Sequence, residues 1–167
     1  MSIKVERNYL EINSLKDLKT LKSHPDDCSI HFSDPADFQI NKFFYKQIGK
    51  QHRWTDRLAW TDKQWIQYIS DQKVKTYILK KKNDFAGYFE LIFHKDRKET
   101  EIAYLGLLEE YQNKKLGSYL LSSAIKNSFS ENIDRVWVHT CSLDHKNALN
   151  NYISRGMRIF KKESVVI

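Results

Sequence analysis

Three strand-like segments that follow one another with only short polar breaks constrain the fold more than any other feature of this sequence. They read VKTYILKK, DFAGYFELIFH and TEIAYLGLL and occupy residues 74–81, 84–94 and 100–108. The breaks between them contain the stretches KKND and KDRKE. Apolar segments of this length joined by polar turns are typical of antiparallel strands in a meander. The sequence therefore predicts an antiparallel sheet in the middle of the chain.

Further elements are predicted upstream of this meander. Residues 3–12 have the character of a strand. An apolar stripe at helical spacing then predicts a helix that stops at Gly49, with this glycine as a left-handed cap. Thr61 and Gln64 have the spacing of a capping box and predict the start of a second helix.

Downstream of the meander, helices and strands alternate. We expect a helix over residues 116–129, a strand over 135–141, a helix over 144–155 and a last strand over 157–164. Such a run brings two strands side by side in parallel, with a helix covering the sheet. The predicted fold class is α+β (α/β), a mixed and mostly antiparallel central sheet flanked by helices.

The length predicts a single domain over residues 1–167. Hydrophobic residues make up 41% of the 167, enough for a core but too few residues for two large domains. The only plausible subdivision is the polar stretch 23–37, which contains Pro25 and Pro35. We therefore expect residues 1–27 to be an N-terminal extension packed on the domain.

The charge favours an anionic partner. Lys plus Arg total 28 and Asp plus Glu total 21, a formal net charge of +7 that suits nucleic acid, acidic lipid or a polyphosphate cofactor. No window approaches the roughly 18 apolar residues of a membrane helix, and the N-terminal stretch lacks a signal-peptide core. We expect a cytoplasmic protein with no membrane partner, in which Cys28 and Cys141 are reduced thiols.

The strongest functional signal lies where the third meander strand enters the following helix, in the stretch LGLLEEYQNKKLGSYLL. A turn before a helix leaves backbone N–H groups without intrahelical partners, and the helix dipole adds positive potential there. Gly117 lets the backbone approach a ligand, and Lys114 and Lys115 add charge. Phosphate binds such a place, although lysines in a turn are most often solvated surface.

These residues resemble the pyrophosphate loop of the GNAT superfamily of N-acetyltransferases. Gln112 and Gly117 fit its pattern of Gln or Arg, two residues, Gly, one residue, and Gly or Ala, while Lys115 stands where the first glycine is expected. Ala148, Tyr152 and Gly156 resemble the family's later helix, with His145 in place of the usual Asn. The similarity covers residues 28–163. The stretches RWTDRLAW and VWVHTCSLDH also resemble an uncharacterised bacterial branch of the family.

The resemblance implies acetyl transfer from acetyl-CoA, as cosubstrate, to an amine. Pantetheine would lie between two splayed parallel strands, against backbone groups of Leu105 and Leu107. The resemblance assigns the pyrophosphate to the loop, at Gln112, Asn113, Lys114, Lys115, Leu116, Gly117 and Ser118. Gly106 then suggests a bulge that splays the strand, with a packing glycine as the alternative.

Two residues are candidates for the proton transfers that amine acetylation needs. Glu101 opens the strand leading to the loop, and strict alternation would put Leu105 and Leu107 on its side, so we predict it as the base. Tyr152 is the candidate acid that reprotonates the CoA thiolate. The structural alternatives are a solvated glutamate at the strand end and a core tyrosine.

The tryptophan-rich stretch QHRWTDRLAW is predicted to line the acceptor pocket. Trp54, Arg57 and Trp60 are the substrate-binding candidates, and the alternative is that these tryptophans wedge the two helices together. His139, Cys141 and His145 have too loose a spacing for zinc and nothing to orient a nucleophile pair, so no metal is predicted.

The predicted function is transfer of an acetyl group to a primary amine of a small-molecule or peptide acceptor. A second hypothesis is a catalytically weak, regulatory GNAT-like domain that binds acyl-CoA, because of the departure at Lys115. The third is a basic nucleic-acid-binding module, which is disfavoured because the lysines are spread along the chain and no recognition motif is present. We expect no nucleic-acid partner, and a homodimer stays open.

Overall fold

A computed structural model describes residues 1–130 and 132–167 of the chain. Its centre is a seven-stranded sheet in the order β2-β3-β4-β5-β6-β1-β7. The strands are β1 (Lys4–Ile12), β2 (Cys28–Phe32), β3 (Val74–Lys81), β4 (Asp84–His94), β5 (Glu99–Leu107), β6 (Arg135–Cys141) and β7 (Arg158–Val166).

The predicted fold class is confirmed. Strands β3, β4 and β5 form the antiparallel meander, and β5 pairs with β6 in parallel, while β1 pairs antiparallel with both β6 and β7. The strand boundaries of β3, β4 and β6 agree with the segments recognised in the sequence. Strand β2 was not predicted, because it lies in the polar stretch 23–37 and pairs with β3 at the edge of the sheet.

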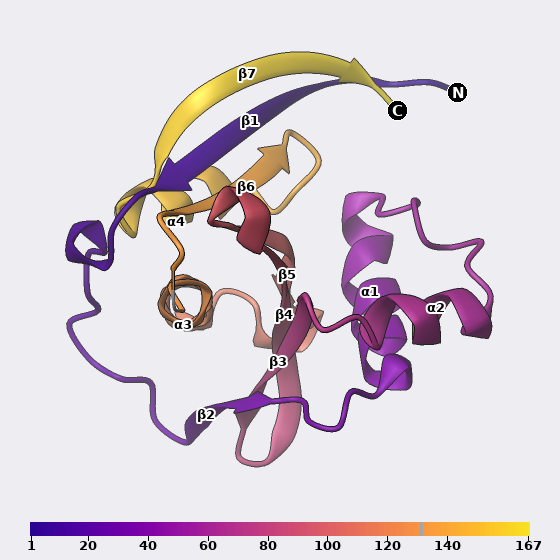
Figure 1. Ribbon diagram of the computed structural model, residues 1–167, viewed down its shortest axis with the longest axis horizontal. Helices are drawn as coiled ribbons and strands as arrows, with labels where there is room; N and C mark the ends of the chain where they lie inside the picture. Colours follow the sequence, from indigo (N-terminus) through magenta and orange to yellow (C-terminus); the bar gives the residue numbers. More distant parts are fainter. Residues whose placement is uncertain (131) are drawn as a thin grey trace.

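The helices cover the two faces of this sheet. Figure 1 shows α1 and α2 on one side and α3 and α4 on the other, with the β1–β7 ribbon arching over one end of the molecule. We call these sides the α1/α2 face and the α3/α4 face. The bounds are α1 (Phe38–His52), α2 (Asp62–Ile69), α3 (Leu116–Ser128) and α4 (Ala148–Ser154).

Helix α1 runs beyond the predicted stop at Gly49. It ends at His52, and Arg53 is its left-handed cap, with φ of 55°. Gly49 lies inside the helix. A Cβ at this position would come within 2.6 Å of the Trp54 Cβ, so the glycine allows the chain after the helix to fold back closely. The capping box between Thr61 and Gln64 is present at the start of α2, as predicted.

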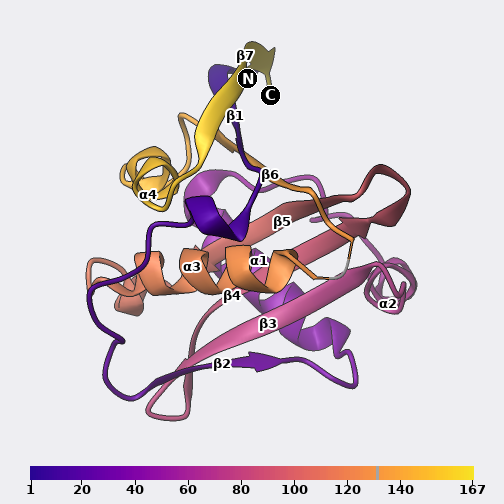
Figure 2. The ribbon, with the colours of Figure 1, turned by 60° about the vertical axis from the view of Figure 1, so that its left-hand side comes forward.

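Residues 4–12, which lie within the expected N-terminal extension, form an interior strand of the sheet. Strand β1 lies between β6 and β7 and pairs with each over most of its length, as the second view also shows (Figure 2). Leu10 and Ile12 are buried in the main core beneath it. Sequence patterning identifies a strand here but cannot identify its partners, which lie more than 120 residues away.

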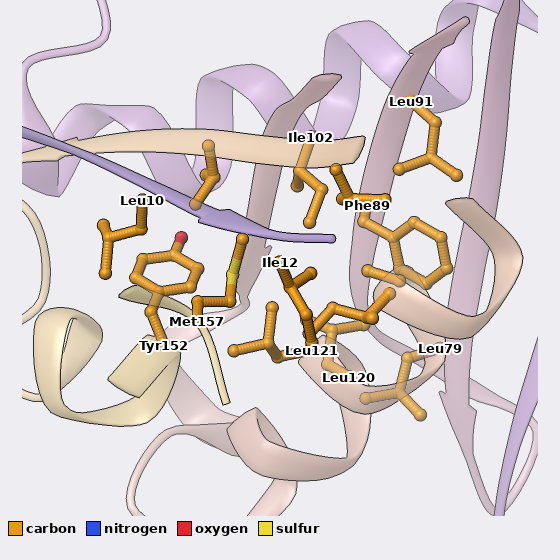
Figure 3. Close-up of a cluster of buried hydrophobic side chains, with 14 of the residues drawn as sticks. Leu10, Ile12, Leu79, Phe89, Leu91, Ile102, Leu120, Leu121, Tyr152 and Met157 are labelled. Atoms are coloured by element: carbon orange, nitrogen blue, oxygen red, sulfur yellow. The ribbon is translucent and has the colours of Figure 1, made fainter. Parts of the chain in front are cut away.

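The main hydrophobic core lies between the sheet and the α3/α4 face. Figure 3 shows side chains from both ends of the chain meeting there, with Leu10 and Ile12 from β1 close to Met157 and Tyr152. Smaller apolar clusters fill the α1/α2 face, around Phe44 and Trp65. Of the helices that the structure describes, none has both the length and the apolar character needed to cross a membrane.

Candidate active site

A cleft opens where the parallel strands β5 and β6 separate. The two strands pair only from Glu99–Arg135 to Glu101–Trp137, and beyond that point they diverge. The cleft has a volume of about 580 Å³ and is lined from both faces of the sheet, by Tyr104 and Trp54 on the α1/α2 face and by Leu120 on the α3/α4 face. A ligand in this cleft would therefore lie within the sheet itself.

A β-bulge at Ala103 reverses the face of the sheet toward which the later side chains of β5 point. Leu91 of β4 pairs with Ile102 and Glu90 pairs with Tyr104, so Ala103 is the extra residue. Ile102 packs in the main core on the α3/α4 face, whereas Tyr104 packs against the clusters of the α1/α2 face. The extra residue reverses the alternation along the rest of β5.

The prediction that Glu101 shares a side with Leu105 and Leu107 is therefore wrong. Leu105 and Leu107 pack against the main core, on the same side as Ile102, which directly follows Glu101. Glu101 consequently faces the α1/α2 side, where its Oε1 lies 3.1 Å from Nε2 of His94. Strict period-two alternation fails here because a single bulge residue shifts the parity of every later side chain.

Gly106 is a packing glycine and not the source of the bulge. It pairs in register with Tyr88, three residues beyond Ala103. A Cβ on Gly106 would lie 2.7 Å from Cγ2 of Ile48 in α1. Helix α1 thus sits directly on the strand at this point, and the glycine makes that approach possible.

The loop before α3 has the backbone conformation that the glycine-rich pattern of phosphate loops provides. Asn113 and Lys115 adopt positive φ angles of 60° and 63°, and Lys115 is the N-cap of α3. Lys115 therefore occupies the left-handed conformation for which glycine is the usual residue. The Gln112 side chain donates to the carbonyl of Leu107 at 3.3 Å, which fixes the loop to the end of β5.

Most of the predicted loop residues line the cleft, namely Gln112, Asn113, Lys115, Gly117 and Ser118. Leu116 is instead buried in the main core, where it anchors the first turn of α3. The Lys114 ammonium lies 5.8 Å from the centre of the Tyr111 ring. A Cβ on Gly117 would meet only Asn151 Nδ2, at an ordinary 3.5 Å, so the space above this glycine is open toward the cleft.

Tyr152 of α4 lines the cleft from the α3/α4 face. Its ring is 7% exposed and packs in the main core (Figure 3). Burial, with a smaller contribution from the charge of Asp144, raises the pKa of Tyr152 above that of an ordinary tyrosine. The hydroxyl therefore stays protonated over the whole neutral range and is able to donate a hydrogen bond.

Among the predicted acceptor residues, the structure separates Trp54 from Arg57 and Trp60. Trp54 lines the cleft. Arg57 is buried on the α1/α2 face, where Nη1 and Nη2 donate to the two carboxylate oxygens of Glu90 at 3.0 and 2.9 Å. Trp60 packs over the Arg57 guanidinium, 4.8 Å from its carbon. Arg57 and Trp60 thus hold the α1–α2 connection in place behind the cleft wall.

Sequence reasoning did not identify Arg7 of β1 as part of the cleft wall. Its position depends on the pairing of β1 with β6, which is distant in the sequence. His52 and Asp56 also line the cleft, and both belong to the stretch QHRWTDRLAW that was predicted to line the acceptor pocket. His52 Nδ1 lies 3.1 Å from the carbonyl oxygen of Leu143, so it links α1 to the β6–α4 connection.

His139 and Cys141 of β6 also line the cleft, but not as metal ligands. Across the residues described, no group of three or more His, Cys, Asp or Glu side chains is arranged to hold a metal ion. Asp144 accepts hydrogen bonds from the Thr140 hydroxyl at 2.6 Å and the Cys141 N–H at 2.9 Å, which fixes the end of β6. Burial raises the pKa of the Cys141 thiol, so it is protonated at neutral pH.

The chain matches the model of the acetyltransferase (GNAT) family over residues 38–157. The comparison with curated proteins gives no match. Solved structures match over 78–99% of the chain, and their sequence identities are low enough that they show the fold alone.

Three of these structures illustrate the likeness. A functionally unknown conserved protein from Staphylococcus epidermidis has a TM-score of 0.71 at 19% identity, over 99% of this chain and 62% of that one. A GCN5-related N-acetyltransferase from Kribbella flavida has a TM-score of 0.68 at 14% identity, over 96% and 56%. An aminoglycoside acetyltransferase from an uncultured soil metagenomic sample has a TM-score of 0.66 at 12% identity, over 78% and 88%. The chain thus spans about three fifths of the first two proteins.

Proposed function

Because this chain belongs to the GNAT family of acetyltransferases, we propose that it transfers an acetyl group from acetyl-CoA to a primary amine. The observation that carries the proposal is the cleft through the splayed strands, with the loop before α3 at one end of it. Such a cleft lets a long cofactor enter between β5 and β6. On the α1/α2 side, the cleft wall at Trp54 and Asp56 would receive the second substrate.

The residues present fit the pyrophosphate of acetyl-CoA. The positive φ angles of Asn113 and Lys115 and the start of α3 turn backbone N–H groups outward, and the helix dipole favours an anion there. The open side of Gly117 gives the phosphates room to approach the backbone. Lys114 and Lys115 add positive charge, as the net charge of +7 led us to expect.

Strand β5 would hold the pantetheine arm. Within the described residues, β5 has no ladder partner on its β6 side beyond Glu101. Backbone groups of Leu105 and Leu107 would therefore serve the pantetheine amides, in the way that a neighbouring strand would serve them. Bound acetyl-CoA would supply an activated thioester and a thiolate leaving group.

Tyr152 would donate a hydrogen bond to the sulfur of the leaving thiolate. A thiol pKa of about 8.5 lies below even the ordinary tyrosine value of about 10, so complete proton transfer from Tyr152 is uphill by at least about 2 kcal/mol. The raised pKa of Tyr152 increases this difference. We therefore assign Tyr152 the stabilisation of the thiolate, which takes its proton from solvent.

The acceptor would bind on the α1/α2 face, next to Trp54 and Asp56. An aromatic ring and a carboxylate suit an aminoalkyl group, because the carboxylate attracts the ammonium form and the ring packs against its carbon chain. One structurally similar protein is an aminoglycoside acetyltransferase, so we include aminoglycosides with polyamines and lysine peptides as candidate acceptors.

The departure at Lys115 does not favour a catalytically weak domain. Lys115 has the left-handed conformation that the family pattern assigns to glycine, so the loop keeps its shape at the cost of backbone strain. This conformation supports cofactor binding by the loop.

The proposal is tested by incubating the protein with acetyl-CoA and a panel of an aminoglycoside, spermidine, free amino acids and a lysine-containing peptide. We expect release of CoA thiol and a mass increase of one acetyl group on at least one amine. Calorimetric titration with CoA checks the cofactor site separately. CoA binding without any acetylated product would support the regulatory alternative, and absence of both would overturn the assignment.

A further inference from the structure

We infer that His139, and not Glu101, accepts the proton from the amine during acetyl transfer. The inference rests on the proposed function and adds a catalytic residue to it. Sequence reasoning weighed His139 only as a metal ligand. The structure places it in the wall of the cleft, at the point where the two substrates would meet.

Strand β6 carries His139 to the acceptor side of the sheet. Trp137 is the last residue of β6 that pairs with β5, and His139 is the next residue on the same side of the strand. Its neighbours Val138 and Val136 pack in the main core, so the His139 ring points to the α1/α2 face. The ring is exposed to the cleft and lies 5.6 Å, between centroids, from the ring of Tyr9.

The charges around the His139 ring come from four parts of the fold. Arg7 contributes from β1, Glu101 from β5, Asp56 from the α1–α2 connection and Asp144 from the β6–α4 connection. Burial against the cleft walls has the largest effect and lowers the pKa of His139. The positive charge of Arg7 lowers this pKa further, whereas the three carboxylates raise it. The net result is a neutral imidazole at pH 7, with a free ring nitrogen that can accept a proton.

Glu101 is less well placed for the same step. Its carboxylate is held by His94 at 3.1 Å, and its side chain is only 20% exposed. Glu101 does not contribute to the cleft wall, whereas His139 does. Its negative charge instead acts on His139, where it favours the imidazolium that proton transfer would create. Glu101 is thus a positioning and electrostatic residue in this arrangement.

The acceptor ammonium first loses one proton to solvent, because only the neutral amine has a lone pair. The amine nitrogen then attacks the thioester carbonyl carbon, a C–N bond forms, and the C–S bond breaks with its electron pair leaving on sulfur. The neutral His139 ring takes the proton that the nitrogen loses. Tyr152 donates a hydrogen bond to the thiolate, which gains a proton from solvent, and His139 returns its proton to solvent.

The test compares H139N with E101Q, using acetyl-CoA and the amine that the wild-type protein acetylates fastest in the panel. We expect H139N to lower kcat by about 10² to 10⁴ with CoA affinity unchanged, and E101Q to lower it much less. In the wild type, kcat/KM should fall on the acid side with a midpoint below pH 6.5. That acid limb should persist in E101Q and disappear in H139N.

Two further measurements separate catalysis from structure. In H139A, added imidazole should restore part of the activity, which a purely structural loss would not allow. The NMR titration of the His139 ring should give a midpoint below 6.5, and it needs no substrate. H31N, on the exposed edge strand β2, is the matched control and should behave like the wild type.

The outcomes distinguish this inference from the proposed function. If the wild type acetylates an amine but H139N is equally active, His139 is not the base and acetyl transfer stands. Loss of the acid limb in E101Q with its retention in H139N would return the role to Glu101. If the wild type acetylates none of the amines, the proposed function fails first.

Discussion

The two faces of the sheet are held together by different kinds of interaction. On the α3/α4 face the packing is almost entirely apolar, built from α3, β1 and the meander strands. On the α1/α2 face a carboxylate that is 1% exposed, Glu90, lies at the centre of a hydrogen-bonded cluster. It accepts from Arg57, from the Tyr68 hydroxyl at 2.9 Å and from the Asn41 amide at 3.0 Å.

The two kinds of interaction constrain the chain to different degrees. Apolar packing on the α3/α4 face needs only volume and pattern. The polar cluster on the α1/α2 face fixes one conformation, because each of its buried groups must find its partner. Arg57 directly follows Asp56, so the cluster also fixes the backbone that carries Asp56 in the cleft wall. In the proposed function, this wall receives the acceptor.

The largest effect is expected from breaking this cluster. Replacing Arg57 with Ala would leave the buried Glu90 carboxylate without its cation, and we expect a loss of about 3–5 kcal/mol in the free energy of unfolding. Urea denaturation followed by circular dichroism measures it. As a control, Lys42→Ala removes an exposed ion pair with Asp62 and should cost less than about 1 kcal/mol. Equal losses in the two variants would show that the cluster is not what holds this face.

A smaller, local effect is expected on the cofactor side from Gly117→Val. The added side chain has room in the folded protein but would obstruct the approach of phosphate, so stability should hold while CoA affinity falls at least about tenfold. Calorimetric titration with CoA checks this result, and an unchanged CoA affinity would remove the loop from cofactor binding.

Gly106→Ala is the contrasting variant. Its Cβ would collide with Ile48, so stability should fall by about 1–3 kcal/mol.

The smallest expected effect concerns Lys115. Lys115→Gly relieves a left-handed conformation and should raise the free energy of unfolding by about 1 kcal/mol. Lys115→Ala keeps the strain and should give no such gain. Both variants lose one positive charge, so CoA affinity should fall slightly and to a similar extent in the two. If Lys115→Gly is no more stable than Lys115→Ala, the loop does not store this strain.

Sequence patterns predicted the meander and the helix that follows it well, for a physical reason. The meander, α3 and the loop before it are local structures, each encoded by a contiguous run of residues. The left-handed conformation of Lys115 falls where the resembled family pattern has glycine. The parallel pairing of β5 with β6 follows from the strand–helix–strand order.

The α1/α2 face could not be predicted in the same way. A single bulge at Ala103 turned Glu101 to the opposite side from Leu105, and alternation carries no mark of such an insertion. Arg57 resembled a solvent-facing binding residue, but its partner Glu90 is 33 residues away. The groups that surround the His139 ring include residues of β1, which is distant in the sequence.

The position of β1 between β6 and β7 also sets the order in which the sheet can be completed. Residues 4–12 leave the ribosome before their first partner strand, which begins at Arg135, about 120 residues later. At ordinary synthesis rates this strand waits on the order of ten seconds with Leu10 and Ile12 uncovered. The alternating charges of KVERNYLEI would protect this segment against pairing with other chains during that time.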